Sequence, residues 1–200
     1  MGRIDYFQLL ELPRQAWLPS DDVRKKFQQL AAAVHPDKER DPLKRDSLQT
    51  LFTGLNDACA CLSSTPRRLR HLLELEYPAL AAQRSGAAMD DAMMDLFSTT
   101  AAAIQQAASV LARKQKAATA LTKAMLAGEV MQAQEALESA AAKVEAAIAA
   151  QDGELRNLDA VRKAGVADSG HKLASGAARA AFLEKWQAQI RAAFAGFFGD

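Results

Sequence analysis

The chain has 200 residues, half of them hydrophobic, with 25 basic and 24 acidic side chains and a formal net charge of +1. This length allows one domain or two small ones, and the apolar content is sufficient for a true core. The balanced charge argues against a broad basic surface, so we expect neither nucleic acid nor a membrane as a partner. No apolar run is long enough to cross a bilayer and the first residues lack the apolar core of a signal peptide, which predicts a cytoplasmic protein.

The sequence contains no set of residues typical of an enzyme. It has no catalytic triad, no phosphate-binding glycine loop and no cluster of metal ligands. Cys59 and Cys61 are separated by one residue in a helical pattern, where neither a disulfide nor a zinc site is expected. We therefore expect no catalytic activity, no cofactor and no metal.

Residues 1–78 predict four helices. The first begins at the N-cap residue Asp5 and ends at Pro13. The second begins at Ser20, its predicted N-cap, and reaches about Val34. The third is expected from Asp41-Pro42 to about Leu62 and the fourth from Thr65-Pro66 to Tyr77-Pro78, since proline is tolerated in a first helical turn and ends a helix that it follows.

The segment His35-Pro36-Asp37-Lys38 lies between the second and third predicted helices. Pro36 disfavours the α conformation at His35 and cannot continue a helix, so this segment is a turn. Apolar residues recur at the helical period on both flanking helices, which can therefore pack antiparallel with the turn at their tip. The flanking helices favour a functional turn over a chance triplet.

A short basic run, Arg24-Lys25-Lys26, lies largely off the apolar stripe of the second helix. Most such runs only solvate a helix face, so a docking role and a purely solvated role are both open.

The four predicted helices and the His35–Lys38 turn together resemble the J-domain of DnaJ-type co-chaperones. The resemblance covers about residues 4 to 76. Within that family the chain is most similar to the HscB-type co-chaperones of iron–sulfur assembly. The segments that carry the resemblance are Asp5-Tyr6-Phe7 with Leu9-Leu10, Lys26-Phe27-Gln28-Gln29-Leu30 followed by His35-Pro36-Asp37-Lys38, and Asn56-Asp57-Ala58. The resemblance implies that a DnaK/HscA-type ATPase chaperone binds His35, Pro36, Asp37, Lys38, Arg24, Lys25 and Lys26.

Beyond residue 78 the sequence becomes rich in alanine. We predict a linker at 79–89 and a helical client- or partner-binding domain at 90–200, with helices at about 90–126, 129–150, 154–164 and 172–198. The predicted breaks are at Gly128, Gly153, Gly165 and Gly170. The predicted fold class is all-α, with an N-terminal J-domain built on an antiparallel helical hairpin and a C-terminal alanine-rich bundle or hairpin.

Four apolar residues of this C-terminal domain are candidate client contacts. HscB-type proteins bind the iron–sulfur scaffold protein through a helical C-terminal domain, and two segments here are similar to its contact surface. They contain Met93, Met94, Phe97 and Phe182. Apolar residues at helical spacing usually face a core, so core and interface both remain open for these side chains.

The resemblance implies a co-chaperone that binds a DnaK/HscA-type chaperone, stimulates its ATPase and delivers a client, with the iron–sulfur scaffold protein as the implied client. The alternative is a general J-domain adaptor with a different client and weak or no stimulation. Gln28 and Gln29 motivate this alternative, because many J-domains carry basic residues there.

Overall fold

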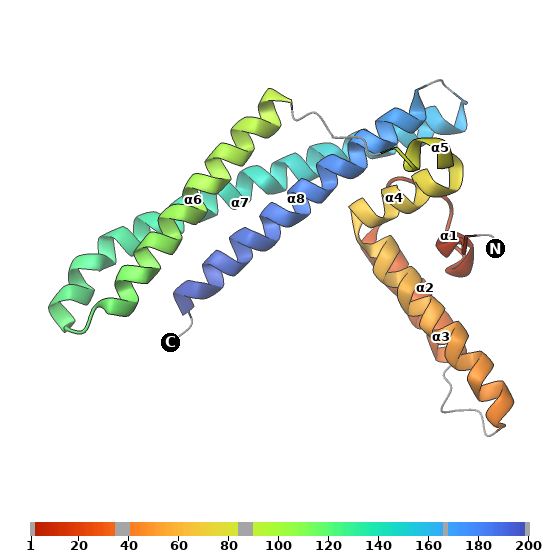
Figure 1. Cartoon of the computed structure of the whole chain (residues 1–200), viewed down its shortest axis with the longest axis horizontal. Coiled ribbons are helices and arrows are strands. Elements are labelled where there is room, and N and C mark those ends of the chain that lie inside the picture. Colours follow the sequence, from red (N-terminus) through yellow and green to blue (C-terminus); the bar gives the residue numbers. More distant parts are fainter. Residues whose placement is uncertain (1–2, 35–40, 84–89, 166–167, 199–200) are drawn as a thin grey trace. The chain divides into compact units, whose positions relative to one another are not determined.

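The computed structural model describes residues 3–34, 41–83, 90–165 and 168–198, and every regular element within these ranges is a helix (Figure 1). The all-α prediction is therefore confirmed. The chain forms two compact units: unit 1 combines residues 1–86 with 152–178, and unit 2 combines 87–151 with 179–200. Helices α7 (Ala120–Lys163) and α8 (Ser169–Phe198) each contribute to both units. No helix in the described ranges is apolar enough over a sufficient length to cross a bilayer.

The first helix, α1 (Tyr6–Leu9), is shorter than predicted. Its N-cap is Asp5, as expected, whose carboxylate accepts hydrogen bonds from the N–H groups of Phe7 at 2.9 Å and Gln8 at 3.3 Å. The predicted end at Pro13 is wrong, because the chain already leaves the helix at Leu10 and Glu11 has a left-handed φ of 52°. A tight turn therefore precedes the proline.

The next helices follow the predicted boundaries closely. They are α2 (Ser20–Ala33), α3 (Pro42–Ser63), α4 (Thr65–Glu76) and the short α5 (Pro78–Ala81), which was not predicted. The N-cap of α2 is Pro19 and not Ser20, since Pro19 has extended backbone angles and Ser20 is already helical. The α2 and α3 helices pack along each other through buried side chains that include Val23, Leu55 and Leu62 (Figure 1). This pairing is the predicted hairpin; its His35–Lys38 turn lies outside the described residues.

A buried polar network fixes the segment between α1 and α2 within unit 1. The carboxylate of Asp159, on α7, accepts hydrogen bonds from the N–H groups of Ala16 at 2.7 Å and Trp17 at 2.9 Å. The Ala16 carbonyl in turn accepts a hydrogen bond from Nε of Arg68 at 2.9 Å, and Arg68 is only 3% exposed. Buried backbone groups must be paired, so these two side chains replace the pairing that a helix or strand would have given this segment.

The start of α8 lies against the end of the J-domain-like helices in unit 1. A Cβ at Gly170 would lie 2.7 Å from Cδ1 of Leu80 and 2.9 Å from Cδ1 of Tyr77. The predicted helix break at Gly170 is therefore wrong, because this glycine is inside α8 and its missing side chain allows a close approach.

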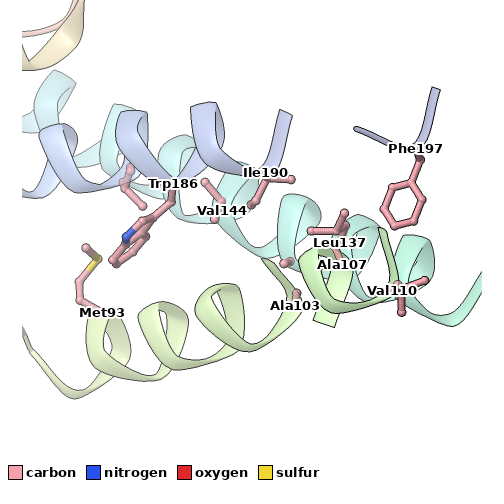
Figure 2. Packing of buried hydrophobic residues seen from close by; sticks show 12 residues of the cluster. Met93, Ala103, Ala107, Val110, Leu137, Val144, Trp186, Ile190 and Phe197 are labelled. Atoms are coloured by element: carbon pink, nitrogen blue, oxygen red, sulfur yellow. The ribbon is translucent and has the colours of Figure 1, made fainter. Parts of the chain in front are cut away.

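Unit 2 is a bundle of α6 (Asp91–Lys116) with the first part of α7 and the last part of α8. Its core contains Met93, Leu137, Val144, Trp186 and Ile190 (Figure 2). Small side chains occupy the α6 and α7 positions between these large ones, namely Ala103, Ala107, Ala133 and Ala140. The alanine-rich composition thus allows close helix packing, and the predicted bundle is confirmed.

Besides the break at Gly170, three other helix boundaries predicted after residue 90 were wrong. The helix that starts near Asp90 ends at Lys116 and not near residue 126, and α7 continues through both Gly128 and Gly153. One glycine costs a helix only about 1 kcal/mol relative to alanine, a cost that the good helix formers around each glycine offset. The true break at 117–119 has Thr119 as its cap, because its Oγ1 accepts from the N–H of Thr122 at 3.1 Å. The break near Gly165 is confirmed, and there φ is 69°.

Candidate functional site

The basic run of α2 lies on the surface of unit 1. Arg24 and Lys25 are exposed, while Val23 beside them is fully buried in the helix interface. Lys26 is half-exposed, and its ammonium group pairs with Glu11 at 3.1 Å. Such exposed pairs contribute little stability, about 0 to 1 kcal/mol, so Lys26 remains available to an incoming acidic surface.

The turn that follows α2 cannot be described in the same way. His35, Pro36, Asp37 and Lys38 lie outside the described residues, and their predicted role in chaperone binding stays a prediction. The ends of the two helices that flank this turn are described, at Ala33 and Pro42.

The four candidate client residues of unit 2 do not share one environment. Met93 is 4% exposed and points at Trp186 within the core (Figure 2). Of the two roles left open for Met93, core packing and client contact, this burial favours core packing. Met94 and Phe97 are 48% and 45% exposed, although they lie one and four residues further along the same helix. Helix geometry explains this for Met94, because adjacent residues are separated by about 100°. Phe97, four residues after Met93, comes back to within about 40° of the same direction and is covered on one side by Trp186.

The structure brings Phe97 of α6 and Phe182 of α8 together through Trp186. The ring centroid of Trp186 lies 6.0 Å from that of Phe97 and 6.0 Å from that of Phe182. Trp186 itself is 3% exposed, and Phe182 is half-buried against the core. We call Met94, Phe97 and Phe182 the aromatic patch. Trp186 was missed in the sequence, although its position four residues after Phe182 places both on one helix face.

His71 of α4 is a buried imidazole that contacts the start of α1 in unit 1. Burial lowers the pKa of His71, which keeps its imidazole neutral, and Nε2 accepts a hydrogen bond from the N–H of Tyr6 at 3.1 Å. The ring of His71 also lies 4.7 Å from that of Tyr6 and stacks on Phe7 at 5.8 Å. The imidazole therefore fixes the start of α1 on α4. In the described part of the chain no group of histidine, cysteine or acidic side chains is arranged to hold a metal.

The sequence of residues 5–71 matches the family model of the DnaJ domain. This chain contains a DnaJ domain. A curated relative, the chaperone protein DnaJ of Methanosarcina acetivorans, is 34% identical over 67 residues, which is 34% of this chain and 16% of the relative. The similarity to that protein is thus confined to the DnaJ domain, and most of its length has no counterpart here.

Solved structures extend the likeness to nearly the whole chain. The chaperone HscB from Vibrio cholerae superposes with a TM-score of 0.59 at 19% identity, over 94% of this chain and 96% of that one. Human co-chaperone HscB gives a TM-score of 0.57 at 18% identity, over 94% of this chain and 81% of the human one. At this level of identity the likeness shows a common fold, in which a DnaJ domain is followed by a helical C-terminal part.

Proposed function

We propose that this chain is a co-chaperone that binds a DnaK/HscA-type ATPase, stimulates its ATP hydrolysis and delivers a client protein to it. The observation that carries the proposal is a DnaJ domain over residues 5–71 that contains His35-Pro36-Asp37 between two packed helices. The HscB-like fold of the whole chain supports a helical C-terminal part that holds the client.

The proposed mechanism is electrostatic. Asp37 would engage a basic group on the chaperone, with His35 and Pro36 holding the turn in shape, and the exposed cations of α2 would guide docking onto an acidic surface. Lys38 follows Asp37 in the sequence and would add a further positive charge to the chaperone contact. Such a contact stimulates hydrolysis only if it is stronger in the hydrolysis-competent conformation of the chaperone than in the resting one.

Stimulation of the chaperone ATPase should weaken as salt rises from about 50 to 200 mM, because exposed charges are screened beyond about 10 Å at 0.1 M. Replacing Arg24, Lys25 and Lys26 together by alanine should lower stimulation at low salt and flatten this dependence. Steady-state ATPase assays with a DnaK-type chaperone measure both effects.

The matched control replaces three exposed lysines of unit 2, Lys116, Lys123 and Lys143, which should leave the salt dependence intact. An unchanged response in the α2 variant would mean that the basic run only solvates its helix. A parent chain that does not stimulate at any salt concentration would favour the adaptor alternative, to which the exposed Gln28 and Gln29 point.

For the client, we propose that the aromatic patch is the contact surface and that an iron–sulfur scaffold protein is the client. The support is local. Met94 and Phe97 expose 48% and 45% of their surface on α6, and Phe182 adds a half-buried ring from α8. Large apolar side chains that are backed by a rigid core are typical anchors of protein interfaces, and methionine adapts its shape to a partner.

Alanine at Met94 or Phe97 should weaken binding of an iron–sulfur scaffold protein by about 1 kcal/mol or more, with little change in thermal stability, because these side chains are exposed. Alanine at the neighbouring Met93 should instead lower the free energy of unfolding by about 2 to 5 kcal/mol, because it leaves a cavity in the core. Calorimetric titration and thermal melting of each variant separate the two effects.

Met131, which is 59% exposed elsewhere on unit 2, provides the control, and alanine there should change neither binding nor melting. If Phe97→Ala binds the scaffold as the parent does, the patch is not the contact surface. If Phe97→Ala melts far below the parent, any loss of binding follows from unfolding.

A further inference from the structure

A pocket in unit 1 lies between the N-terminal segment and α4, apart from the residues assigned to the chaperone or the client. Its volume is about 370 Å³, and we call it the α4 pocket. The chain contributes Arg3, Ile4 and Tyr6 from one side, Cys61 from the end of α3, and Arg67, Arg70, His71 and Glu74 from α4. All of these residues belong to the same compact unit.

The charge of this pocket is strongly unbalanced. Three guanidinium groups line it against one carboxylate, that of Glu74, and burial keeps His71 neutral by lowering its pKa. Glu74 is already engaged, since it lies 3.2 Å from Nη2 of Arg3 and 3.1 Å from Nε of Arg70. Two positive charges therefore remain uncompensated in the pocket, while the chain as a whole carries only +1.

Of the three arginines in the pocket, Arg67 has the most N–H donors available to a ligand. Its side chain is exposed, and within the described residues it has no carboxylate partner, unlike Arg3 and Arg70. A guanidinium has five N–H donors arranged to hold a carboxylate through two hydrogen bonds. Nη2 of Arg70 donates a hydrogen bond to the carbonyl of Ala81 at 3.5 Å, so Arg67 together with Nη1 of Arg70 is suited to an anionic group brought in by a ligand.

The N-terminal side of the pocket also offers an apolar side chain, that of Ile4. Ile4 is 62% exposed there, so an apolar side chain of the ligand would cover it. A nucleic acid suits the pocket less well, because the ring of Tyr6 is already paired with His71 at 4.7 Å and is not free to stack on a base. A peptide in which carboxylates and apolar side chains alternate would match both the guanidinium groups and Ile4.

From this combination we propose that the α4 pocket binds an acidic peptide segment, with carboxylates on Arg67 and Arg70 and an apolar side chain against Ile4. The site shares no residue with the basic run of α2, the His35–Lys38 turn or the aromatic patch. It gives the DnaJ domain a second, independent contact for an acidic protein.

The test is fluorescence anisotropy of a labelled short peptide of alternating glutamate and leucine, titrated with the full chain at low salt. Arg67→Gln should weaken binding about tenfold, the usual effect of losing one charged hydrogen-bonding partner. Glu74→Gln should tighten binding severalfold, because it removes the one carboxylate among the described residues that line the pocket. Lys143→Gln, the same loss of charge at an exposed site on unit 2, should leave the affinity unchanged.

Circular dichroism of each variant shows that it is folded, and Arg67 is exposed, so its replacement should not disturb the helices. The proposal is overturned if the glutamine version of the peptide binds equally well, or if Arg67→Gln binds like the parent. It is also overturned if a single-stranded oligonucleotide displaces the peptide at equal concentration, which would assign the pocket to phosphate groups.

Discussion

Replacing Asp159 by alanine is expected to lower the free energy of unfolding of unit 1 by about 3 to 5 kcal/mol, the usual cost of breaking a buried ionic network. Asp159 is 7% exposed and accepts the N–H groups of Ala16 and Trp17. Without the carboxylate both donors lose their partner, the N–H of Ala16 in a buried place and the N–H of Trp17 in a partly buried one. The loop between α1 and α2 should then lose its fixed position.

The same carboxylate balances buried positive charge. Nη1 of Arg162 lies 2.7 Å from Oδ1 of Asp159, and Nη2 of Arg162 pairs with both oxygens of Glu76 at 2.7 and 2.6 Å. Burial lowers the pKa of Arg68, an effect that Asp152 and Asp159 oppose. Alanine at position 159 would therefore leave two largely buried guanidinium groups with less counter-charge.

Urea unfolding of the full chain, followed by tryptophan fluorescence, measures this loss. Trp17 reports on unit 1, where its ring lies 3.9 Å from the guanidinium carbon of Arg156, and Trp186 reports on the core of unit 2. Asp57→Ala, at an exposed aspartate of α3, is the control and should change stability by less than about 0.5 kcal/mol. A loss below about 1 kcal/mol for Asp159→Ala would mean that the network does not stabilise the loop.

This network also links the DnaJ domain to residues far outside its matched range, 5–71. Residues 152–178 pack in the same compact unit as the DnaJ domain, so a fragment limited to residues 1–78 lacks the acceptor for Ala16 and Trp17. The predicted division into residues 1–78, a linker at 79–89 and residues 90–200 stays a prediction.

The helices of the DnaJ domain could be predicted from sequence because their signals are local. Asp5 caps α1, and prolines open α3 and α4 and follow the end of α4. The apolar residues that recur at the helical period in α2 include Val23, which is fully buried, as such a pattern predicts. Each of these signals depends on residues within a turn or two of the feature that they define.

The features that could not be predicted depend on residues far apart in the chain. Nothing near Asp159 indicates that its partners lie 143 and 142 residues earlier. The sequence predicts helix breaks at Gly128 and Gly153, yet α7 stays helical through both. Met93 and Met94 are equally apolar, and only the packing of α6 decides that the first is core and the second is exposed. Helical periodicity predicts which face of a helix is apolar, but it does not predict which other helix packs against that face.

The second large effect is expected at the turn after α2, where Asp37→Asn should abolish stimulation of a DnaK-type chaperone while leaving the fold intact. The substitution removes one negative charge and keeps nearly the same volume, and a turn carboxylate contributes charge and not core packing. His35→Gln should behave in the same way, because it alters the shape of the turn. Circular dichroism of both variants should match that of the parent.

The most direct measurement is the steady-state ATPase rate of a DnaK-type chaperone with equal concentrations of the parent chain, Asp37→Asn and Asp95→Asn. Asp95 is exposed on α6, so its variant makes the same change of charge outside the DnaJ domain. We expect the parent and Asp95→Asn to raise the rate alike, and Asp37→Asn to leave it at the level of the chaperone alone. Equal stimulation by the parent and Asp37→Asn would contradict the proposed function, even with the DnaJ domain fully folded.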